Sequence, residues 1–287
     1  MMRQQYFMCG CGWLGLPLAR ELHQQGHKLY GTSTRIEQCA YLTESGITAY
    51  PLVLSKDTPQ HFPSDADHAM FTAMRQSDWV LLNIPPKRRD LQEQPFLSNL
   101  QSLVSTILAQ NDHTKILFIS TTSVFGQFSD TLIELDEMSP TCPTTPSGRV
   151  HAQMEQWLLC HYPSQSTVLR LGGLISTTRH PITSICKREY FNDGQQVVNL
   201  IHQEDAIGLI KAIFTQQHTG VIFHGCAPEH PSRLTYYRQS AKSKGLVFPD
   251  FDQDVLLQPL SGKSIQSRKT QQMLGFKYKF VSPFDML

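Results

Sequence analysis

The sequence has 287 residues, of which 40% are hydrophobic, and a formal net charge of +1 at pH 7. This length can bury a sizeable core in one large or two smaller domains. The nearly balanced charge argues against a nucleic-acid-binding face made of bulk positive charge, and no apolar run is long enough to span a membrane. Seven scattered cysteines without a C-x-x-C pair predict neither a disulfide framework nor a metal site. Because the first residues also lack the apolar region of a signal peptide, we expect a cytoplasmic protein.

The first predicted strand, residues 6–9, leads into a glycine-rich stretch. Residues 10–15 match the pattern G-x-G-x-x-G, and Leu14, Leu18 and Leu22 follow at helical spacing. A strand, this pattern and a helix together form the dinucleotide-binding fingerprint, in which the glycines allow a tight turn, close approach of the backbone to a pyrophosphate, and close packing of helix on strand. An ordinary glycine-rich turn is the alternative. The residues of this stretch that we expect to bind the cofactor are Gly10, Cys11, Gly12, Trp13, Leu14 and Gly15.

The segment after the second predicted strand, residues 28–32, indicates which dinucleotide binds. A carboxylate near the end of this strand would bond the ribose hydroxyls of NAD, whereas a basic residue accommodates the additional phosphate of NADP. Here Ser33, Thr34 and Arg35 follow, and the first acidic residue is Glu37. Hydroxyl groups and an arginine suit a phosphate, so the segment favours NADP, with NAD as the alternative. The competing interpretation is that Arg35 only begins a solvent-exposed helix.

Strand and helix signals alternate along the rest of the chain. Further strands are predicted at residues 47–53, 79–84, 115–120, 167–171 and 221–224, and helices at residues 36–45, 97–108, 148–161, 204–217, 234–244 and 266–274. A loop with a short helix is expected at 178–196, and an extended segment at 197–201. This alternation is typical of an α/β fold, a Rossmann-type doubly wound parallel sheet with helices on both faces. We expect residues 1–172 to form the dinucleotide-binding domain, with 197–228 returning to it, and residues 173–287 to form mainly a smaller C-terminal substrate-binding lobe.

Residues 118–126, with the sequence FISTTSVFG, are followed by characteristic segments at 143–155, 170–175, 199–206 and 261–276. In their order and gaps, these stretches resemble motifs of the extended short-chain dehydrogenase/reductase family, which includes the NAD-dependent epimerases and dehydratases of nucleotide sugars. The resemblance covers most of the chain and implies a nicotinamide cofactor. We expect Pro85 and Ser120 to contact this cofactor as well.

The catalytic residues of that family are a Ser or Thr and a Tyr-x-x-x-Lys pair, and the chain departs from this set. Thr121 occupies the Ser/Thr position, but with the chain aligned on Glu155 the tyrosine position falls on Ser147 and the lysine position on His151. A serine hydroxyl is a far poorer proton donor or base than a phenol. His151 titrates near neutral pH and lies one helical turn from Ser147, which makes it a candidate acid or base. The candidate catalytic residues are therefore Thr121, Ser147 and His151, although His151 could instead be a satisfied surface histidine.

These observations favour an atypical NAD(P)-binding oxidoreductase or epimerase/dehydratase that acts on a sugar-like or other small carbonyl substrate. The alternative is a non-catalytic NADP(H)-binding sensor or regulatory partner protein, because the usual tyrosine and lysine are absent. The resemblance implies a homodimer formed through helices at 95–110 and 148–161. Residues 10–19 also resemble the first turn of nucleotide-sugar 6-dehydrogenases, but those chains continue into an all-helical domain, which the strand signals at 170–227 argue against.

Overall fold

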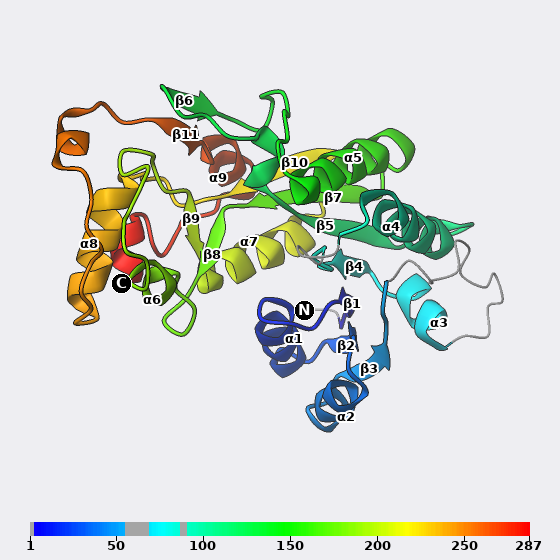
Figure 1. Cartoon of the computed structure of the whole chain (residues 1–287). Helices are drawn as coiled ribbons and strands as arrows, with labels where there is room; N and C mark the ends of the chain where they lie inside the picture. Colours follow the sequence, from blue (N-terminus) through cyan, green and yellow to red (C-terminus); the bar gives the residue numbers. More distant parts are fainter. Residues whose placement is uncertain (1–2, 55–68, 87–90) are drawn as a thin grey trace. The chain divides into compact units, whose positions relative to one another are not determined.

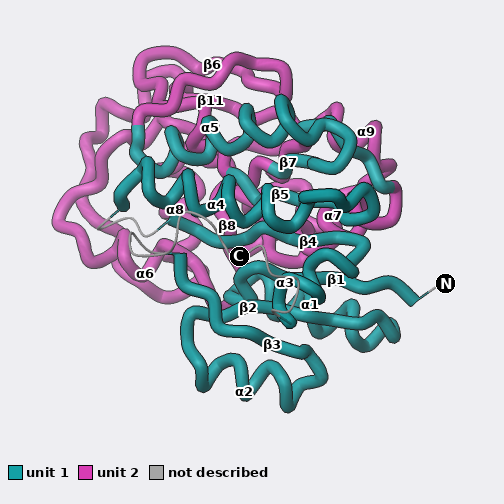
Figure 2. The backbone as a smooth tube through the Cα atoms, turned by 90° about the vertical axis from the view of Figure 1, so that its right-hand side faces the viewer, with its two compact units in different colours: residues 1–120, 145–169, 217–222 teal, residues 121–144, 170–216, 223–287 magenta. Residues whose placement is uncertain are grey.

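The computed structural model describes residues 3–54, 69–86 and 91–287. The chain divides into two compact units (Figure 2). Unit 1 comprises residues 1–120, 145–169 and 217–222, and unit 2 comprises residues 121–144, 170–216 and 223–287. The expected division at residue 172 separates a cofactor-binding domain from a substrate-binding lobe by function. This division stays a prediction.

A seven-stranded sheet forms the framework of unit 1, and three of its strands continue into unit 2 (Figure 1). Its strand order is β10-β7-β5-β4-β1-β2-β3, and the pairs β3–β2, β2–β1, β1–β4 and β4–β5 are parallel. Because the order reverses between β1 and β4, this sheet is doubly wound, as predicted. Its strands are β1 (Gln5–Cys9), β2 (Lys28–Ser33), β3 (Thr48–Pro51), β4 (Trp79–Leu82), β5 (Lys115–Thr121), β7 (Ser166–Leu171) and β10 (Val221–Gly225).

The predicted helices are present, with ends that differ by a few residues. Helix α4 begins four residues before its apolar pattern, because its first turn is largely polar and has no hydrophobic period to mark it. Helix α3 was not predicted from the sequence. The helices are α1 (Gly15–Gln24), α2 (Ile36–Glu44), α3 (Ala69–Arg75), α4 (Glu93–Leu108), α5 (Pro146–His161), α6 (Ile182–Ile185), α7 (Gln203–Gln216), α8 (Arg233–Ser243) and α9 (Arg268–Leu274).

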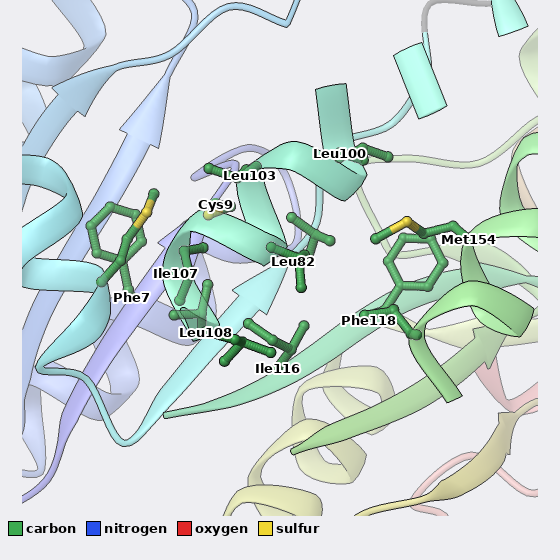
Figure 3. Packing of buried hydrophobic residues seen from close by; sticks show 14 of the residues in the cluster. Phe7, Cys9, Leu82, Leu100, Leu103, Ile107, Leu108, Ile116, Phe118 and Met154 are labelled. Atoms are coloured by element: carbon green, nitrogen blue, oxygen red, sulfur yellow. The ribbon is translucent and has the colours of Figure 1, made fainter. Parts of the chain in front are cut away.

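The core of unit 1 lies between one face of the sheet and the helices α3, α4 and α5 (Figure 3). Side chains from β1, β4 and β5 meet the buried side of α4, and Met154 of α5 packs beside Phe118. Residues that alternate with these along the strands, such as Met8, Leu81 and Leu117, are also fully buried, so both faces of the sheet are covered. This two-sided burial explains why the strands read as continuous apolar runs.

Unit 2 contains two small two-stranded sheets that the sequence did not reveal. Strand β6 (Leu132–Leu135) pairs in parallel with β11 (Gly262–Ile265), and β8 (Gly173–Ile175) pairs in parallel with β9 (Leu200–His202). Within the segment expected to be extended at 197–201, only residues 200 and 201 belong to a strand, β9. Val197 forms an isolated β-bridge with Ser232. A second apolar core lies under α6 and α8, where Ile182, Leu234 and Tyr236 are almost completely buried.

Candidate cofactor and active site

The glycine-rich turn between β1 and α1 is held against the end of β4. Gly10 has a φ of +100°, which a glycine adopts easily, and a Cβ atom there would lie 2.3 Å from the carbonyl oxygen of Asn83. The Asn83 amide in turn donates to the Gly10 carbonyl oxygen at 3.3 Å. A Cβ atom on Gly15 would lie 2.4 Å from that same carbonyl oxygen. Both glycines are therefore required by the close packing of the turn itself.

Gly12 differs from these two glycines, because a Cβ atom at Gly12 would have no atom of the described residues within 4 Å, apart from its two chain neighbours. Nothing in the folding of unit 1 thus requires a glycine at this position. The turn leads directly into the N-terminus of α1, where the Leu16 N–H donates to the Gly12 carbonyl oxygen at 2.9 Å. An open glycine at the N-terminus of a helix is what a bound pyrophosphate would need.

Thr32, at the end of β2, fixes the other side of the turn. Its hydroxyl accepts the Gly10 N–H at 3.0 Å, and its carbonyl oxygen accepts the Cys11 N–H at 2.9 Å. Thr32 was not among the expected cofactor contacts, although its hydroxyl begins the segment Thr32–Thr34 that the sequence places before Arg35. Cys11 is buried, and its thiol lies 3.7 Å from the Met8 carbonyl oxygen, so its side chain points into the protein. Burial raises the pKa of the Cys11 thiol to about 12.

A cavity of about 580 Å³ opens beside this turn, at the carboxyl ends of the strands of unit 1. One part of its wall carries the hydroxyl-bearing residues at 32–34, and most of the remainder is apolar. Four residues predicted to bind the cofactor are among the described lining residues: Gly10, Ser33, Thr34 and Pro85. The lining residues that sequence reasoning missed are Thr32, Leu52, Val53, Leu54, Ile84, Leu91, Gln92, Pro95 and Phe96.

Arg35 stands at the boundary between the Ser33–Thr34 wall and helix α2. It is the residue before the first helical turn, with an extended backbone, and its N–H donates to the Ser33 hydroxyl at 3.3 Å. Its guanidinium is exposed and lies 3.5 Å from the Gln38 amide oxygen. Arg35 is not among the described residues that line the cavity, and neither are Cys11, Gly12, Trp13, Leu14, Gly15 and Ser120.

Ser147 and His151 lie one turn apart at the start of α5. The helix begins at Pro146 because the Thr145 hydroxyl caps it by accepting the Gly148 N–H at 3.1 Å. The Nδ1 atom of His151 lies 2.7 Å from the carbonyl oxygen of Ser147. Since a carbonyl only accepts, Nδ1 carries the proton in the neutral ring and Nε2 carries the lone pair. Ser147 therefore contributes its main chain, which fixes the tautomer of the histidine.

His151 is a buried residue and not the surface histidine of the alternative interpretation. Its side chain is 8% exposed, and its ring stacks on Phe118 with centroids 5.6 Å apart. Burial lowers the pKa of His151, although the Ser147 carbonyl and the charge of Glu155 act in the opposite direction. The ring is therefore neutral at pH 7 and can accept a proton at Nε2.

Ser120 and Glu155 form a buried pair in the same region of unit 1. The Ser120 hydroxyl donates to the Glu155 carboxylate, and both residues are almost fully buried. Glu155 follows His151 by one helical turn. Sequence reasoning used Glu155 only to align α5 with a family motif, whereas the structure makes it the partner of Ser120. The predicted cofactor contact of Ser120 is therefore limited to its backbone and its oxygen lone pairs, because its proton is directed to Glu155.

Thr121 directly follows Ser120 and belongs to unit 2. It precedes the 3-10 turn η1 (Thr122–Phe125), and its hydroxyl oxygen accepts the Ser123 N–H at 3.2 Å. The Thr121 hydroxyl donates to the Ser123 hydroxyl at 3.1 Å. Both side chains are partly exposed. The structure thus adds Ser123 to the candidate residues, and the run of hydroxyl residues at 120–123 was the signal that could have identified it.

Among residues 3–54, 69–86 and 91–287, no three His, Cys, Asp or Glu side chains come together as metal ligands would. None of the helices in these ranges combines the length and apolar character needed to cross a membrane.

Known proteins resemble the chain over nearly its whole length, although no protein-family model matches it. Protein YeeZ of Escherichia coli K12 is 33% identical over 277 residues, which cover 96% of this chain and 96% of YeeZ. The solved structure of dTDP-glucose 4,6-dehydratase from Bacillus anthracis in complex with NAD gives a TM-score of 0.76 at 13% identity, covering 99% of this chain and 93% of that one.

Two further solved structures show the same fold. A functionally unknown conserved protein from Silicibacter pomeroyi has a TM-score of 0.74 at 21% identity, and the match covers 99% of this chain and 96% of that chain. The UDP-glucuronic acid 4-epimerase of Bacillus cereus in complex with NAD has a TM-score of 0.73 at 18% identity, covering 98% and 94%. The fold is thus that of the NAD-dependent epimerases and dehydratases, as the sequence motifs implied. The 33% identity with YeeZ along 96% of both sequences establishes the closer relationship, and the chain belongs to the family of Protein YeeZ.

Proposed function

We propose that the chain binds a nicotinamide dinucleotide in unit 1 and acts as an oxidoreductase or epimerase/dehydratase on a sugar-like carbonyl substrate. The observation that carries this proposal is the open position at Gly12, in a turn whose Gly10 lines a cavity of about 580 Å³ with a hydroxyl wall and an apolar wall. The apolar part suits an adenine ring, and the hydroxyl-bearing residues suit a ribose or its phosphate. When bound, the nicotinamide would supply the hydride acceptor or donor.

The described lining residues favour NADP over NAD. They include no Asp or Glu that could pair with free ribose hydroxyls, and they do include Ser33 and Thr34. Arg35 follows directly and keeps its guanidinium exposed to solvent, where it could meet a phosphate. Solved neighbours of the same fold contain NAD, so NAD stays the alternative cofactor.

Two side-chain groups would carry out the chemistry: a hydroxyl would polarise the substrate oxygen, and an imidazole would accept the substrate proton. When substrate binds, the Thr121 hydroxyl would turn its proton from the Ser123 hydroxyl, 3.1 Å away, to the substrate oxygen and polarise it. His151 would accept the substrate proton at Nε2, because Nδ1–H is committed to the Ser147 carbonyl oxygen. Glu155, whose charge favours the imidazolium, would stabilise the protonated ring. Ser147 would position His151 through its main chain.

The substrate class is proposed from the solved neighbours. The dehydratase is named for a dTDP-sugar and the epimerase for a UDP-sugar, so nucleotide sugars are the first compounds to test. A homodimer through α4 and α5 and a cytoplasmic location are further proposals. The dimer would be tested by light scattering after size-exclusion chromatography.

The test compares His151→Gln with His161→Gln in a panel of UDP- and dTDP-sugars with NADPH, NADP, NADH and NAD. His161 is a matched control, because its Nδ1 also lies against a carbonyl oxygen one turn earlier, at 2.8 Å from Trp157, while its side chain is exposed. We expect His151→Gln to lower kcat by about 10²- to 10⁴-fold, as loss of a general base does. Cofactor affinity should not change, and His161→Gln should behave as the wild type.

Two results would contradict the proposed chemistry. Turnover that survives in both His151→Gln and Thr121→Ala would remove these residues from the mechanism. Tight NADPH binding without hydride transfer to any compound of the panel would favour the alternative, a dinucleotide-binding sensor. This alternative is supported by Ser147 and His151, which replace the tyrosine and lysine of the related enzymes.

A further inference from the structure

Lys263 of β11 is a partly buried lysine in unit 2. Its Nζ donates to the carbonyl oxygen of Thr122 at 2.8 Å and to that of Gly126 at 2.6 Å. These two residues are the first residue of the η1 turn and the residue that ends it. One side chain, 137 positions or more away in sequence, therefore joins both ends of the turn that follows Thr121.

The backbone of Lys263 is itself anchored. The Asn199 side chain donates to the Lys263 carbonyl oxygen at 2.7 Å, and its amide oxygen accepts the Ile265 N–H at 2.9 Å. On the far side of the turn, Gly126 adopts a φ of +74°, and a Cβ atom there would lie 2.2 Å from the Cys142 carbonyl oxygen. The turn is thus clamped between a fixed lysine and a backbone contact that only a glycine allows.

Even partial removal of a lysine ammonium from water costs free energy, so it is a weak way to stabilise a fold. Burial lowers the pKa of Lys263 to about 8, and within the described part of the chain no carboxylate forms an ion pair with it. Replacing a buried charge by an apolar side chain of similar volume is often neutral or stabilising. Global stability therefore does not account for Lys263, whereas its two bonds to the ends of η1 do.

We propose that Lys263 is a positioning residue that sets the η1 turn and thereby the orientation of the Thr121 and Ser123 hydroxyls toward the substrate. The assignment of these hydroxyls to a substrate rests on the proposed function. The clamping of the turn by Lys263 does not, and it can be tested on the protein without any ligand. Lys263 would act through the turn, since two of its three Nζ–H groups donate to carbonyl oxygens of the turn.

The experiment measures amide hydrogen exchange in the full-length protein for Lys263→Met, Lys263→Arg and Lys277→Met. The reporters are the N–H groups of Ser123 and Gly126, which donate to the Thr121 hydroxyl and the Ser123 carbonyl oxygen within the turn. We expect exchange at these two amides to rise about tenfold or more in Lys263→Met. Arginine should restore protection, because a guanidinium can also donate to two carbonyl oxygens. Lys277 is exposed, so its variant serves as the matched control.

Unchanged exchange at Ser123 and Gly126 in Lys263→Met would overturn the proposal. A rise that extends equally to α7 and α9 would also overturn it, because Lys263 would then only stabilise unit 2 as a whole. With a nucleotide sugar that the wild type converts, Lys263→Met should lower kcat about tenfold while the Kd of NADPH stays the same. If the wild type binds no dinucleotide, the proposed function fails, and the exchange result still decides whether Lys263 holds the turn.

Discussion

Gly12→Ala is expected to fold like the wild type and to lose dinucleotide binding. Apart from its chain neighbours, a methyl group at Gly12 meets no atom of residues 3–54, 69–86 and 91–287 within 4 Å, so the folded state of these residues accommodates it. Alanine also lowers the backbone entropy of the unfolded chain. The same methyl group would occupy the space where a pyrophosphate approaches the backbone. We expect the melting temperature to stay within a few degrees of the wild type and NADPH affinity to fall by a factor of about 100, equivalent to roughly 3 kcal/mol.

Gly15→Ala is the contrasting variant. Its Cβ atom would lie 2.4 Å from the Gly10 carbonyl oxygen, so either the turn or the helix must move. The expected loss of folding stability is about 1 to 3 kcal/mol, as for other overpacked sites. Melting curves and NADPH titrations of both variants separate the two roles. Normal NADPH affinity in Gly12→Ala would show that the open position at Gly12 is not a binding surface, and the glycine-rich turn would then be an ordinary one.

Acid is expected to destabilise unit 2 through His224, a residue of β10. This ring is completely buried, its Nδ1 donates to the Gln266 carbonyl oxygen at 2.9 Å, and its Nε2 has no hydrogen-bond partner among the described residues. Burial lowers the pKa of His224 to about 4, although the nearby Glu137 and Asp136 oppose this effect and Arg170 adds to it. The Phe125 ring packs against it edge-on, at 5.5 Å.

The sign of the pH effect follows from the lowered pKa. Between pH 6.5 and 4, the unfolded chain binds a proton at His224 that the folded protein does not, so the free energy of unfolding falls as the pH falls through this range. We expect His224 to account for about 1 to 3 kcal/mol of this loss. His180, whose pKa burial also lowers to about 4, adds a similar slope.

Urea unfolding at pH 7, 6, 5 and 4 measures this slope. His224→Gln cannot titrate, so its free energy of unfolding should fall less steeply than that of the wild type, whereas the exposed control His161→Gln should keep the full slope. Equal slopes for His224→Gln and the wild type would mean that His224 is not neutral in the folded protein, and its assigned role in acid sensitivity would be wrong.

The fold could be predicted because its central strands have clear signals in the local sequence. Residues 79–82 and 116–118 are apolar and buried on both faces, and the shortness of these runs and the turn residues beside them favour strands over helices. Strands β6, β8 and β11 were missed for the opposite reason. They are three or four residues long, and polar residues such as Glu134 and Lys263 interrupt β6 and β11. These strands form by pairing between segments distant in sequence, which no local pattern indicates.

The candidate site was predicted only where local sequence determines it. The glycine-rich turn and residues 33–34 follow from their position after a strand. The apolar wall of the cavity could not be predicted, because Leu52 and Phe96 lie far apart in sequence and line the same cavity only in the folded protein. The burial of His151 against Phe118 and the contact of Ser120 with Glu155 likewise depend on the packing of α5 in unit 1, which no spacing along the chain reveals.

Isothermal titration of the full-length wild-type protein with NADPH, and in parallel with NADH, tests the central claim most directly. The account predicts one dinucleotide per chain, a dissociation constant in the micromolar range or tighter, and preference for NADPH that Arg35→Asp abolishes. Equal affinity for the two dinucleotides would refute the NADP preference assigned to the segment at residues 33–35. Absence of binding of either dinucleotide at millimolar concentration would contradict the claim that unit 1 is a nicotinamide dinucleotide site.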